Sequence, residues 1–386
     1  MNTIFDRWLD NLVRTADAEL PQSYREDMRA EGRRVFKDIM SPRGLDRRHV
    51  LVVGGAGYIG SPLTENLLSA GYRVTCLDHI LYGNSQCVAN FIGHPDYRFV
   101  PGDLADPAIV EDALDGVSDV VILAGLVGDP ITKKYPEWSG LINDDGIQDL
   151  VRSLNGRGLA RVLFISTCSN YGEIPENITA TEDYELKPLS LYAKSKVGIE
   201  TMLLGLQGRT DYTGTILRFA TAFGLSPRMR FDLSVSEFTR EMFLGRDLEV
   251  YDADTWRPYC HVRDFARAIR RVLEAPVARV DFKVFNAGGD RNNFTKQMIV
   301  DTIKAKLPNS SYKIVRGGMD RRNYKVDFSR IRETLYFEPR YSVEDGVAEL
   351  IDALSKGLFA DAETNRNFYG NYEIDYAPAH RAEAAE

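Results

Sequence analysis

The sequence has few of the residues that build disulfide frameworks and metal centres. Among its 386 residues it contains four cysteines and five histidines. Cys76, Cys87, Cys168 and Cys260 form no CxxC pair, so the spacing predicts neither a disulfide scaffold nor a zinc site. We therefore expect no metal in this protein.

Long apolar runs and an excess of basic residues are also missing. No run of about 18 apolar residues occurs, and Asp6, Arg7 and Asp10 place charges near the N-terminus. We expect neither a membrane span nor a signal peptide. The formal net charge is −8, and no stretch is densely filled with Lys and Arg, which argues against a nucleic-acid-binding surface. These absences predict a cytoplasmic protein with no membrane or nucleic-acid partner.

The first 46 residues differ in composition from the rest of the chain. The segment "IFDRWLDNLVRTADAEL" spaces its apolar residues for one helical face, and "YREDMRAEGRRVFKDIM" is suited to a second helix. We interpret residues 1–46 as a helical N-terminal extension that packs on its own domain or on a neighbouring subunit. A membrane-surface helix is disfavoured because acidic residues are mixed into the polar face.

From His49 onward, short apolar runs alternate with stretches long enough for helices. The runs are "VLVV", "RVTCLD", "YRFVPGD", "DVVILAG", "RVLFIS" and "TGTILR". This alternation indicates an α/β fold with a doubly wound parallel sheet covered by helices on both faces. The length allows two lobes. The tail over 361–386 is polar and ends in Ala and Glu, so we expect it to be partly disordered.

A glycine-rich turn follows the first of these strands. In "VLVVGGAGYIGSPLTENLLSAGYRVTCLD", Gly54, Gly57 and Gly60 stand between a strand and a helix, with Tyr58 and Ile59 in the same turn. Glycines in this position let backbone amides approach a pyrophosphate, which also interacts favourably with the helix N-terminus. The turn therefore predicts a dinucleotide site.

Two carboxylates at strand ends fit the rest of a dinucleotide. Asp78 lies 24 residues beyond Gly54, where it would accept hydrogen bonds from ribose hydroxyls and repel a 2′-phosphate. No Arg directly follows it, so NAD is favoured over NADP. In "PGDLAD", Asp103 either holds the adenine amino group with the help of Leu104 or is a simple turn residue.

A tyrosine and a lysine one helical turn apart carry the second chemical signal. Tyr192 and Lys196 in "SLYAKSK" share one face of a predicted helix. A nearby ammonium and an oxidised nicotinamide would lower the pKa of the phenol from its usual value of about 10. The phenolate would take a proton from a sugar hydroxyl. A Ser or Thr at the end of the strand "FIST" would hold the same oxygen.

Together these motifs resemble those of the extended short-chain dehydrogenases/reductases, and within them the NAD-dependent nucleotide-sugar epimerase/dehydratase family. The resemblance covers roughly 49–355 and rests on "GGAGYIG", "GDL", "STCSNYG", "YAKSK", "LRFATAFG", "WRPYCHVRDFARAI" and "YFEP". It implies a Rossmann-type NAD-binding domain over 47–220. It also implies a smaller α/β C-terminal substrate lobe, mainly over 221–360, with some chain crossing back. A homodimer paired through the helix that bears Tyr192 is implied as well.

The resemblance assigns roles to individual residues. In the family, the catalytic Ser or Thr stands five residues before the glycine that closes the strand-end motif. That spacing makes Thr167 the catalytic hydroxyl and Gly172 the closing residue, with Ser166 as the adjacent structural serine. Tyr192 and Lys196 match the catalytic Tyr and Lys of the family, which also contact the cofactor.

The residues after Thr167 discriminate among the reactions of the family. Nucleotide-sugar 4,6-dehydratases carry an Asp-Glu pair there, whereas this chain has Cys168 and Ser169. The resemblance therefore argues against a 4,6-dehydratase. We place both residues at the substrate, although a buried, inert thiol is the simpler role for Cys168. The reactions that remain are 4-epimerisation, net oxidation at C4 and the reverse ketone reduction; a non-catalytic NAD-binding protein is the further alternative.

The substrate end is assigned by the same resemblance. Arg257 in "WRPYCHVRDFARAI" matches an Arg that grips the substrate diphosphate. Arg322 is the candidate for a second such Arg, with Arg316 and Arg321 close by in the sequence. Thr221 stands where many members have an Asn that contacts the sugar diphosphate. We thus expect a nucleotide-sugar substrate, tightly held NAD and 4-epimerisation as the reaction.

Overall fold

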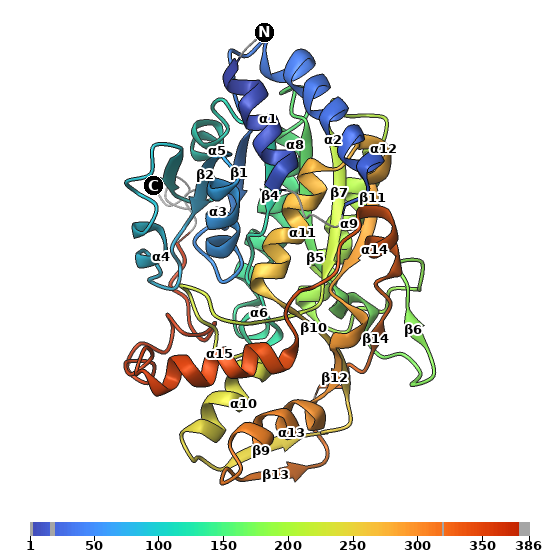
Figure 1. Ribbon diagram of the computed structural model, residues 1–386. Helices are drawn as coiled ribbons and strands as arrows, with labels where there is room; N and C mark the ends of the chain where they lie inside the picture. The colour runs from blue at the N-terminus through green and yellow to red at the C-terminus, as the bar shows by residue number, and fades with distance from the viewer. Residues whose placement is uncertain (1–2, 16–19, 319, 378–386) are drawn as a thin grey trace.

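The computed structural model describes residues 3–15, 20–318 and 320–377 (Figure 1). Within these residues, seven parallel strands form the central sheet in the order β11-β7-β5-β4-β1-β2-β3. The strands are β1 (His49–Val53), β2 (Arg73–Asp78), β3 (Tyr97–Pro101), β4 (Asp119–Ile122), β5 (Arg161–Thr167), β7 (Thr213–Phe219) and β11 (Lys283–Ala287). The predicted doubly wound sheet is confirmed, because all six apolar runs noted above form strands of it.

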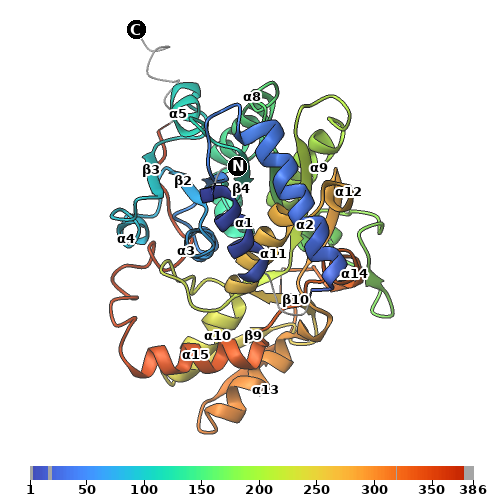
Figure 2. The same ribbon diagram turned by 45° about the horizontal axis from the view of Figure 1, so that its top comes forward.

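Helices cover both faces of this sheet, as Figures 1 and 2 show. Apolar residues of α3 (Gly60–Ser69) and α11 (Val262–Glu274) pack on one face. Those of α5 (Pro107–Ala113), α8 (Ile147–Ser153) and α9 (Leu191–Leu204) pack on the other. Strands β1, β4, β5 and β7 are buried along their whole length, as expected for a sheet between two helical layers.

The N-terminal extension forms α1 (Thr3–Thr15), α2 (Gln22–Val35) and a short π-helix η1 (Phe36–Met40). Trp8 of α1 is buried and meets Tyr72 edge to face, with ring centroids 5.6 Å apart. Glu31 of α2 forms an ion pair of 3.4 Å with the buried Arg161 at the start of β5. The extension therefore packs on its own domain. Residues 16–19 of the first predicted helix lie outside the described residues.

A smaller lobe lies below the carboxyl edge of the sheet in Figure 1. Its core is built by α10 (Ser234–Phe243), α13 (Lys296–Lys306) and α15 (Val343–Ser355) with the parallel pair β9 (Leu248–Tyr251) and β13 (Tyr312–Val315). Three short strands, β8 (Thr221–Phe223), β10 (Trp256–His261) and β12 (Asn293–Thr295), form a second sheet, and β6 (Thr179–Ala180) pairs with β14 (Lys325–Val326). Both α11 and β11 belong to the central layers, so the chain returns from the smaller lobe to the central sheet.

The remaining short helices connect these layers. They are α4 (Gln86–Ala89), α6 (Asp129–Lys134), α7 (Pro136–Ser139), α12 (Val277–Val280) and α14 (Ser329–Leu335), with the π-helix η2 (Gly140–Gly146) and the 3₁₀ helices η3 (Cys168–Tyr171) and η4 (Asp290–Asn292). None of the helices in the described ranges is long and apolar enough to cross a membrane.

The chain after α15 turns back from the lobe toward the sheet (Figure 2). Ile374 and Tyr376 are buried in the hydrophobic core beneath α5, α8 and α9. Residues 362, 368–371, 374 and 376 are buried, whereas residues 378–386, on which the expected disorder of the end of the tail falls, lie outside the described residues. The tail thereby brings polar and aromatic side chains to the carboxyl edge of the sheet.

Candidate active site

A cavity of about 690 Å³ lies at the carboxyl ends of the parallel strands. Residues at or directly after the ends of five strands line it: Gly54, His79, Leu123, Thr167 and Ala220. The cavity continues into the smaller lobe, where residues of α10, β9 and β10 form its wall. Ligands of open α/β sheets bind at this edge.

The glycine turn forms one wall of the cavity. Gly54 has a φ of 86°, and a Cβ there would lie 2.8 Å from the backbone nitrogen of Ala124. A Cβ on Gly60, the first residue of α3, would lie 2.5 Å from the carbonyl oxygen of Gly54. Only glycine fits this close packing of turn and helix. The predicted cofactor residues Gly54, Gly57, Tyr58, Ile59 and Gly60 all line the cavity.

Tyr58 also ties the turn to the smaller lobe. Its hydroxyl donates to the carbonyl oxygen of Gly224 at 2.6 Å, and the Ser226 hydroxyl donates to the carbonyl oxygen of Tyr58 at 2.8 Å. The segment that follows β8 is therefore fixed against the glycine turn. It brings Arg228 and Arg230 to the cavity wall.

Asp78 stands at the end of β2 and faces the same cavity. Its two carboxylate oxygens accept hydrogen bonds from the backbone amides of Ala56 (3.0 Å) and Ile80 (2.8 Å). Burial raises the pKa of Asp78, while the two amides act in the opposite direction. Each oxygen keeps a free lone pair for a ribose hydroxyl, so turn and carboxylate fit NAD.

Asp103 lines the cavity with Leu104, but it has a partner that the sequence did not reveal. Its Oδ2 accepts a hydrogen bond of 2.7 Å from the hydroxyl of Tyr376 in the C-terminal segment. The ring of Tyr376 also lies 5.7 Å from that of His79. No local sequence motif connects Tyr376 with Asp103 or His79. Only the folded chain shows that the C-terminal segment contributes to the end of the cavity that Asp103 lines.

Thr167, Tyr192 and Lys196 meet on the wall opposite the glycine turn. Thr167 is the last residue of β5, and Tyr192 and Lys196 lie in the first turns of α9, which Ser190 caps by accepting from the amide of Ala193 at 3.2 Å. The Lys196 ammonium donates to the carbonyl oxygen of Ile165 at 2.9 Å. It lies 5.9 Å from the centroid of the Tyr192 ring.

Burial and nearby charges shift the pKa values of both Tyr192 and Lys196 in the chain by itself. Burial raises the pKa of Tyr192, the charge of Arg230 opposes this most strongly, and the charge of Asp129 adds to it. The lowering of this pKa by Lys196 together with an oxidised nicotinamide, predicted from the sequence, stays a prediction. Burial lowers the pKa of Lys196 to about 8, partly countered by Glu200.

Ser166 turns away from this group into a buried network. Its hydroxyl donates to the carboxylate of Glu200, which also accepts from the Asn170 amide at 2.8 Å and from the Arg218 guanidinium at 2.7 Å. Ser166, Asn170, Glu200 and Arg218 are each at most 5% exposed. This network joins β5, η3, α9 and β7 behind the catalytic candidates.

The two residues after Thr167 have different surroundings in the structure. The Cys168 thiol is buried, donates to the carbonyl oxygen of Arg218 at 3.3 Å and does not line the cavity. The prediction that Cys168 contacts the substrate is therefore corrected: its thiol belongs to the core. Burial raises its pKa, which makes it inert. Ser169 does line the cavity, with its hydroxyl 3.2 Å from that of Tyr324, and so does Thr221.

Arg257 and Arg322 converge at the substrate end of the cavity. Both bind the carboxylate of Asp320, at 3.1 and 2.7 Å, and Arg322 also pairs with Asp129 at 3.2 Å. Arg321, in contrast, has a side chain that is 78% exposed and pairs with Glu173. Of the two neighbouring arginines, only Arg322 faces the cavity. The structure thus brings together the two guanidinium groups that were expected to bind a diphosphate.

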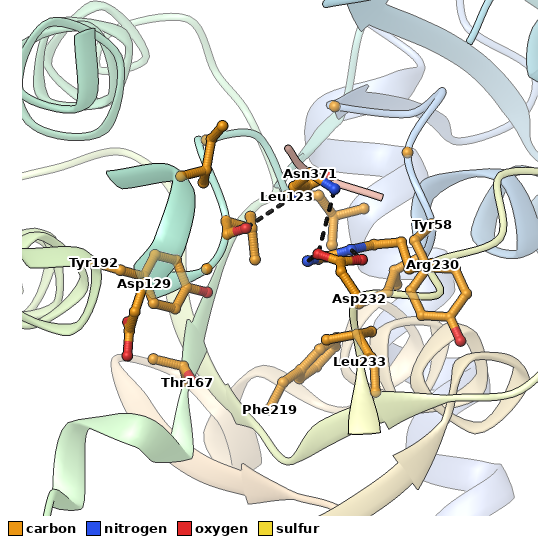
Figure 3. A pocket seen from close by; sticks show the side chains of 18 of the residues that line it. Tyr58, Leu123, Asp129, Thr167, Tyr192, Phe219, Arg230, Asp232, Leu233 and Asn371 are labelled. Carbon is orange, nitrogen blue, oxygen red and sulfur yellow. Dashed lines mark hydrogen bonds and ion pairs between the residues drawn. The ribbon is translucent and has the colours of Figure 1, made fainter. Parts of the chain in front are cut away.

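Several lining residues were missed by sequence reasoning. Figure 3 shows Asp129 beside Tyr192 and Thr167, with Arg230 and Asp232 across the cavity. Arg230 pairs with Asp232, and Asn371 of the C-terminal segment donates to the carbonyl oxygen of Val127 at 2.8 Å. They belong to no motif considered above. In the described part of the chain, no group of three or more His, Cys, Asp and Glu could hold a metal ion.

Comparisons with known proteins give consistent matches. The chain matches the model of the NAD dependent epimerase/dehydratase family over residues 50–288. It is 31% identical over 314 residues to a dTDP-glucose 4,6-dehydratase of Streptomyces griseus, covering 78% of this chain and 93% of the relative. It is 30% identical over 267 residues to a UDP-glucose 4-epimerase of Corynebacterium glutamicum, covering 65% and 78%.

A solved structure extends the likeness to the whole fold. The crystal structure of DesIV, a dTDP-glucose 4,6-dehydratase from Streptomyces venezuelae with NAD bound, matches with a TM-score of 0.73 and 26% identity. The match covers 84% of this chain and 100% of that chain.

Proposed function

Because the chain belongs to the NAD-dependent epimerase/dehydratase family, we propose that it is a nucleotide-sugar 4-epimerase that keeps its NAD through the reaction. The predictions of this family, of a Rossmann-type fold and of NAD as cofactor are confirmed. Relatives in the family differ in the reaction they catalyse. The choice among reactions therefore depends on the residues of this site.

The observation that carries the proposal is the set of groups around Thr167. Loss of water across two sugar carbons needs a base for the proton and an acid for the leaving hydroxyl. Cys168 is buried outside the cavity, and the Ser169 hydroxyl lies beside that of Tyr324. Beside Thr167 and Tyr192, Figure 3 labels the carboxylate of Asp129, which Arg322 engages. The site is suited to proton transfer at one carbinol.

Four side chains would act in that proton transfer. Tyr192 takes the proton of the reacting hydroxyl and later returns it, and Thr167 hydrogen-bonds the same oxygen. Arg230 and Lys196 supply positive charge near the phenol. NAD, when bound, would supply the hydride acceptor and donor for the carbinol carbon, and its oxidised ring would add positive charge. Because the tail contacts Asp103 and Val127 around the cavity, the chain is suited to retaining the cofactor.

The reaction is tested by incubating the purified protein with nucleotide hexoses and recording both sugar products and reduced cofactor. A 4-epimer formed without net accumulation of reduced NAD is the expected result. Accumulation of reduced NAD with a 4-keto sugar would instead indicate a dehydrogenase. Consumption of reduced NAD by a 4-keto sugar would indicate a ketoreductase. A protein that binds NAD and changes none of these compounds would contradict the proposal.

Replacing Arg257 by Met tests the proposed diphosphate site. Arg257 is 6% exposed, and its guanidinium stacks over Tyr324 at 5.1 Å. A charge-assisted hydrogen bond to phosphate is worth about 1.5–3 kcal/mol, so we expect KM for the nucleotide sugar to rise at least about 10-fold. Steady-state kinetics measure this change, with a smaller effect expected on kcat.

The matched control is Arg321→Met, which removes an exposed guanidinium from the loop that carries Arg322. Its KM should stay within about twofold of the wild-type value, since surface pairs contribute little. Equal effects of the two substitutions would contradict the assignment of Arg257.

We also propose a cytoplasmic homodimer that pairs through α9. Leu191 at its start and the preceding Leu189 are 44% and 50% exposed, which leaves apolar surface for a partner subunit. Light scattering of the purified protein measures the mass, and a mass equal to one chain at micromolar concentration would contradict a dimer.

A further inference from the structure

Asp129 is a carboxylate that the proton transfer proposed above does not use. It is the first residue of α6 and follows Gly128, whose φ of 116° turns the chain toward the cavity. Figure 3 shows its carboxylate beside Thr167 and the Tyr192 ring. Asp129 therefore lies where the reacting end of a sugar would sit.

The two oxygens of this carboxylate have different surroundings. Oδ2 forms the ion pair of 3.2 Å with Arg322. Oδ1 is buried and has no hydrogen-bond partner among the described residues. A buried acceptor without a donor is costly, above all on a charged group. A ligand that brings a hydroxyl to this oxygen would satisfy it.

From this geometry we propose that Asp129 selects the sugar: it accepts a hydrogen bond from the hydroxymethyl group on the carbon next to the reacting carbinol of a neutral hexose, and it disfavours a sugar with a carboxylate in place of that hydroxymethyl group. The inference rests on the proposed function, because it assumes that a nucleotide sugar occupies this cavity. It narrows the substrate class to hexoses with a hydroxyl at this position, as opposed to hexuronic acids.

The surrounding charges support this selection. Arg322 is bound by both Asp129 and Asp320 before any ligand arrives. A diphosphate brings further negative charge to Arg257 and Arg322. A uronate carboxylate would then face the carboxylate of Asp129, while Arg322 is already engaged by Asp129, Asp320 and the diphosphate. Two like charges about 4 Å apart repel strongly enough in a partly buried site to lower affinity by at least about 10-fold.

The test compares a nucleotide hexose with the hexuronic acid of the same nucleotide. Calorimetry gives the two dissociation constants for wild type, Asp129→Asn and Asp129→Ser, each with its NAD bound. We expect wild type to bind the hexose at least about 10-fold more tightly. In both variants, the ratio of the dissociation constant for the uronic acid to that for the hexose should fall toward one, mainly because the uronic acid binds more tightly. Asp149→Asn, an exposed carboxylate of α8 paired with Arg152, should keep the wild-type ratio.

The outcomes separate this inference from the proposed function. A wild-type preference for the uronic acid, or equal ratios in wild type and both variants, would overturn the selection by Asp129 even if the enzyme epimerises hexoses. Binding of neither compound by wild type would overturn both proposals. Binding with the expected ratios but without epimerisation would leave the selection standing and overturn the 4-epimerase. Retention of NAD by each variant shows that its site is folded.

Discussion

Tyr192→Phe is expected to lower kcat by about three orders of magnitude while the protein keeps its NAD. A positioned general acid or base contributes roughly 10²–10⁴-fold, and Phe removes the hydroxyl without changing the ring. Thr167 and Lys196 line the same cavity, so groups other than the Tyr192 hydroxyl still bind the sugar. KM should therefore change much less than kcat. Steady-state kinetics and the absorbance of the co-purified cofactor measure these effects.

The control for this substitution is Tyr212→Phe. Tyr212 is 5% exposed, its hydroxyl has no hydrogen-bond partner among the described residues, and it does not line the cavity. Loss of the Tyr212 hydroxyl should leave kcat within about twofold of the wild-type value, since a substitution away from the site removes no group that acts in the reaction. If Tyr192→Phe lowered kcat by less than about 10-fold, the proton would have another acceptor.

The surroundings that set the pKa of Tyr192 could not be predicted from the sequence. The spacing of Tyr192 and Lys196 was enough to place both on α9 at one cavity, because helical periodicity is a local property. The charges that act on the phenol come from Arg230 and Asp129, which arrive from segments after β8 and β4. Which charges surround a group, and how deeply it is buried, depends on long-range packing that spacing does not encode.

The same difference between local pattern and long-range packing explains which parts of the fold were predicted. Six strands were predicted because each is a short apolar run between turn signals, and a buried parallel strand needs no more than that. The run in β11 was overlooked because Lys283 and Asn286 interrupt it. The contact of Tyr376 with Asp103 was equally invisible. The polar composition of the tail predicts disorder, whereas a few aromatic residues are sufficient to anchor its first part.

Removing the Glu200 carboxylate should have the largest effect on stability. Glu200 is 2% exposed and pairs with Arg218, which is 5% exposed. In Glu200→Ala the guanidinium stays buried without its counter-ion, which typically costs about 3–5 kcal/mol. Urea unfolding with the cofactor concentration held constant measures this loss. Asp149→Ala, which breaks an exposed ion pair on α8, should cost less than about 1 kcal/mol.

A double variant distinguishes an uncompensated charge from simple loss of packing. Glu200→Leu combined with Arg218→Met replaces the buried pair by apolar groups, and such replacements are often neutral or stabilising. We expect it to recover most of the stability lost in Glu200→Ala. Activity should not recover with it, because Glu200 also accepts from Ser166 and Asn170 and so holds α9 against the end of β5. A double variant as unstable as Glu200→Ala would contradict the electrostatic explanation. One that regained full kcat would show that Tyr192 and Thr167 keep their relative positions without this network.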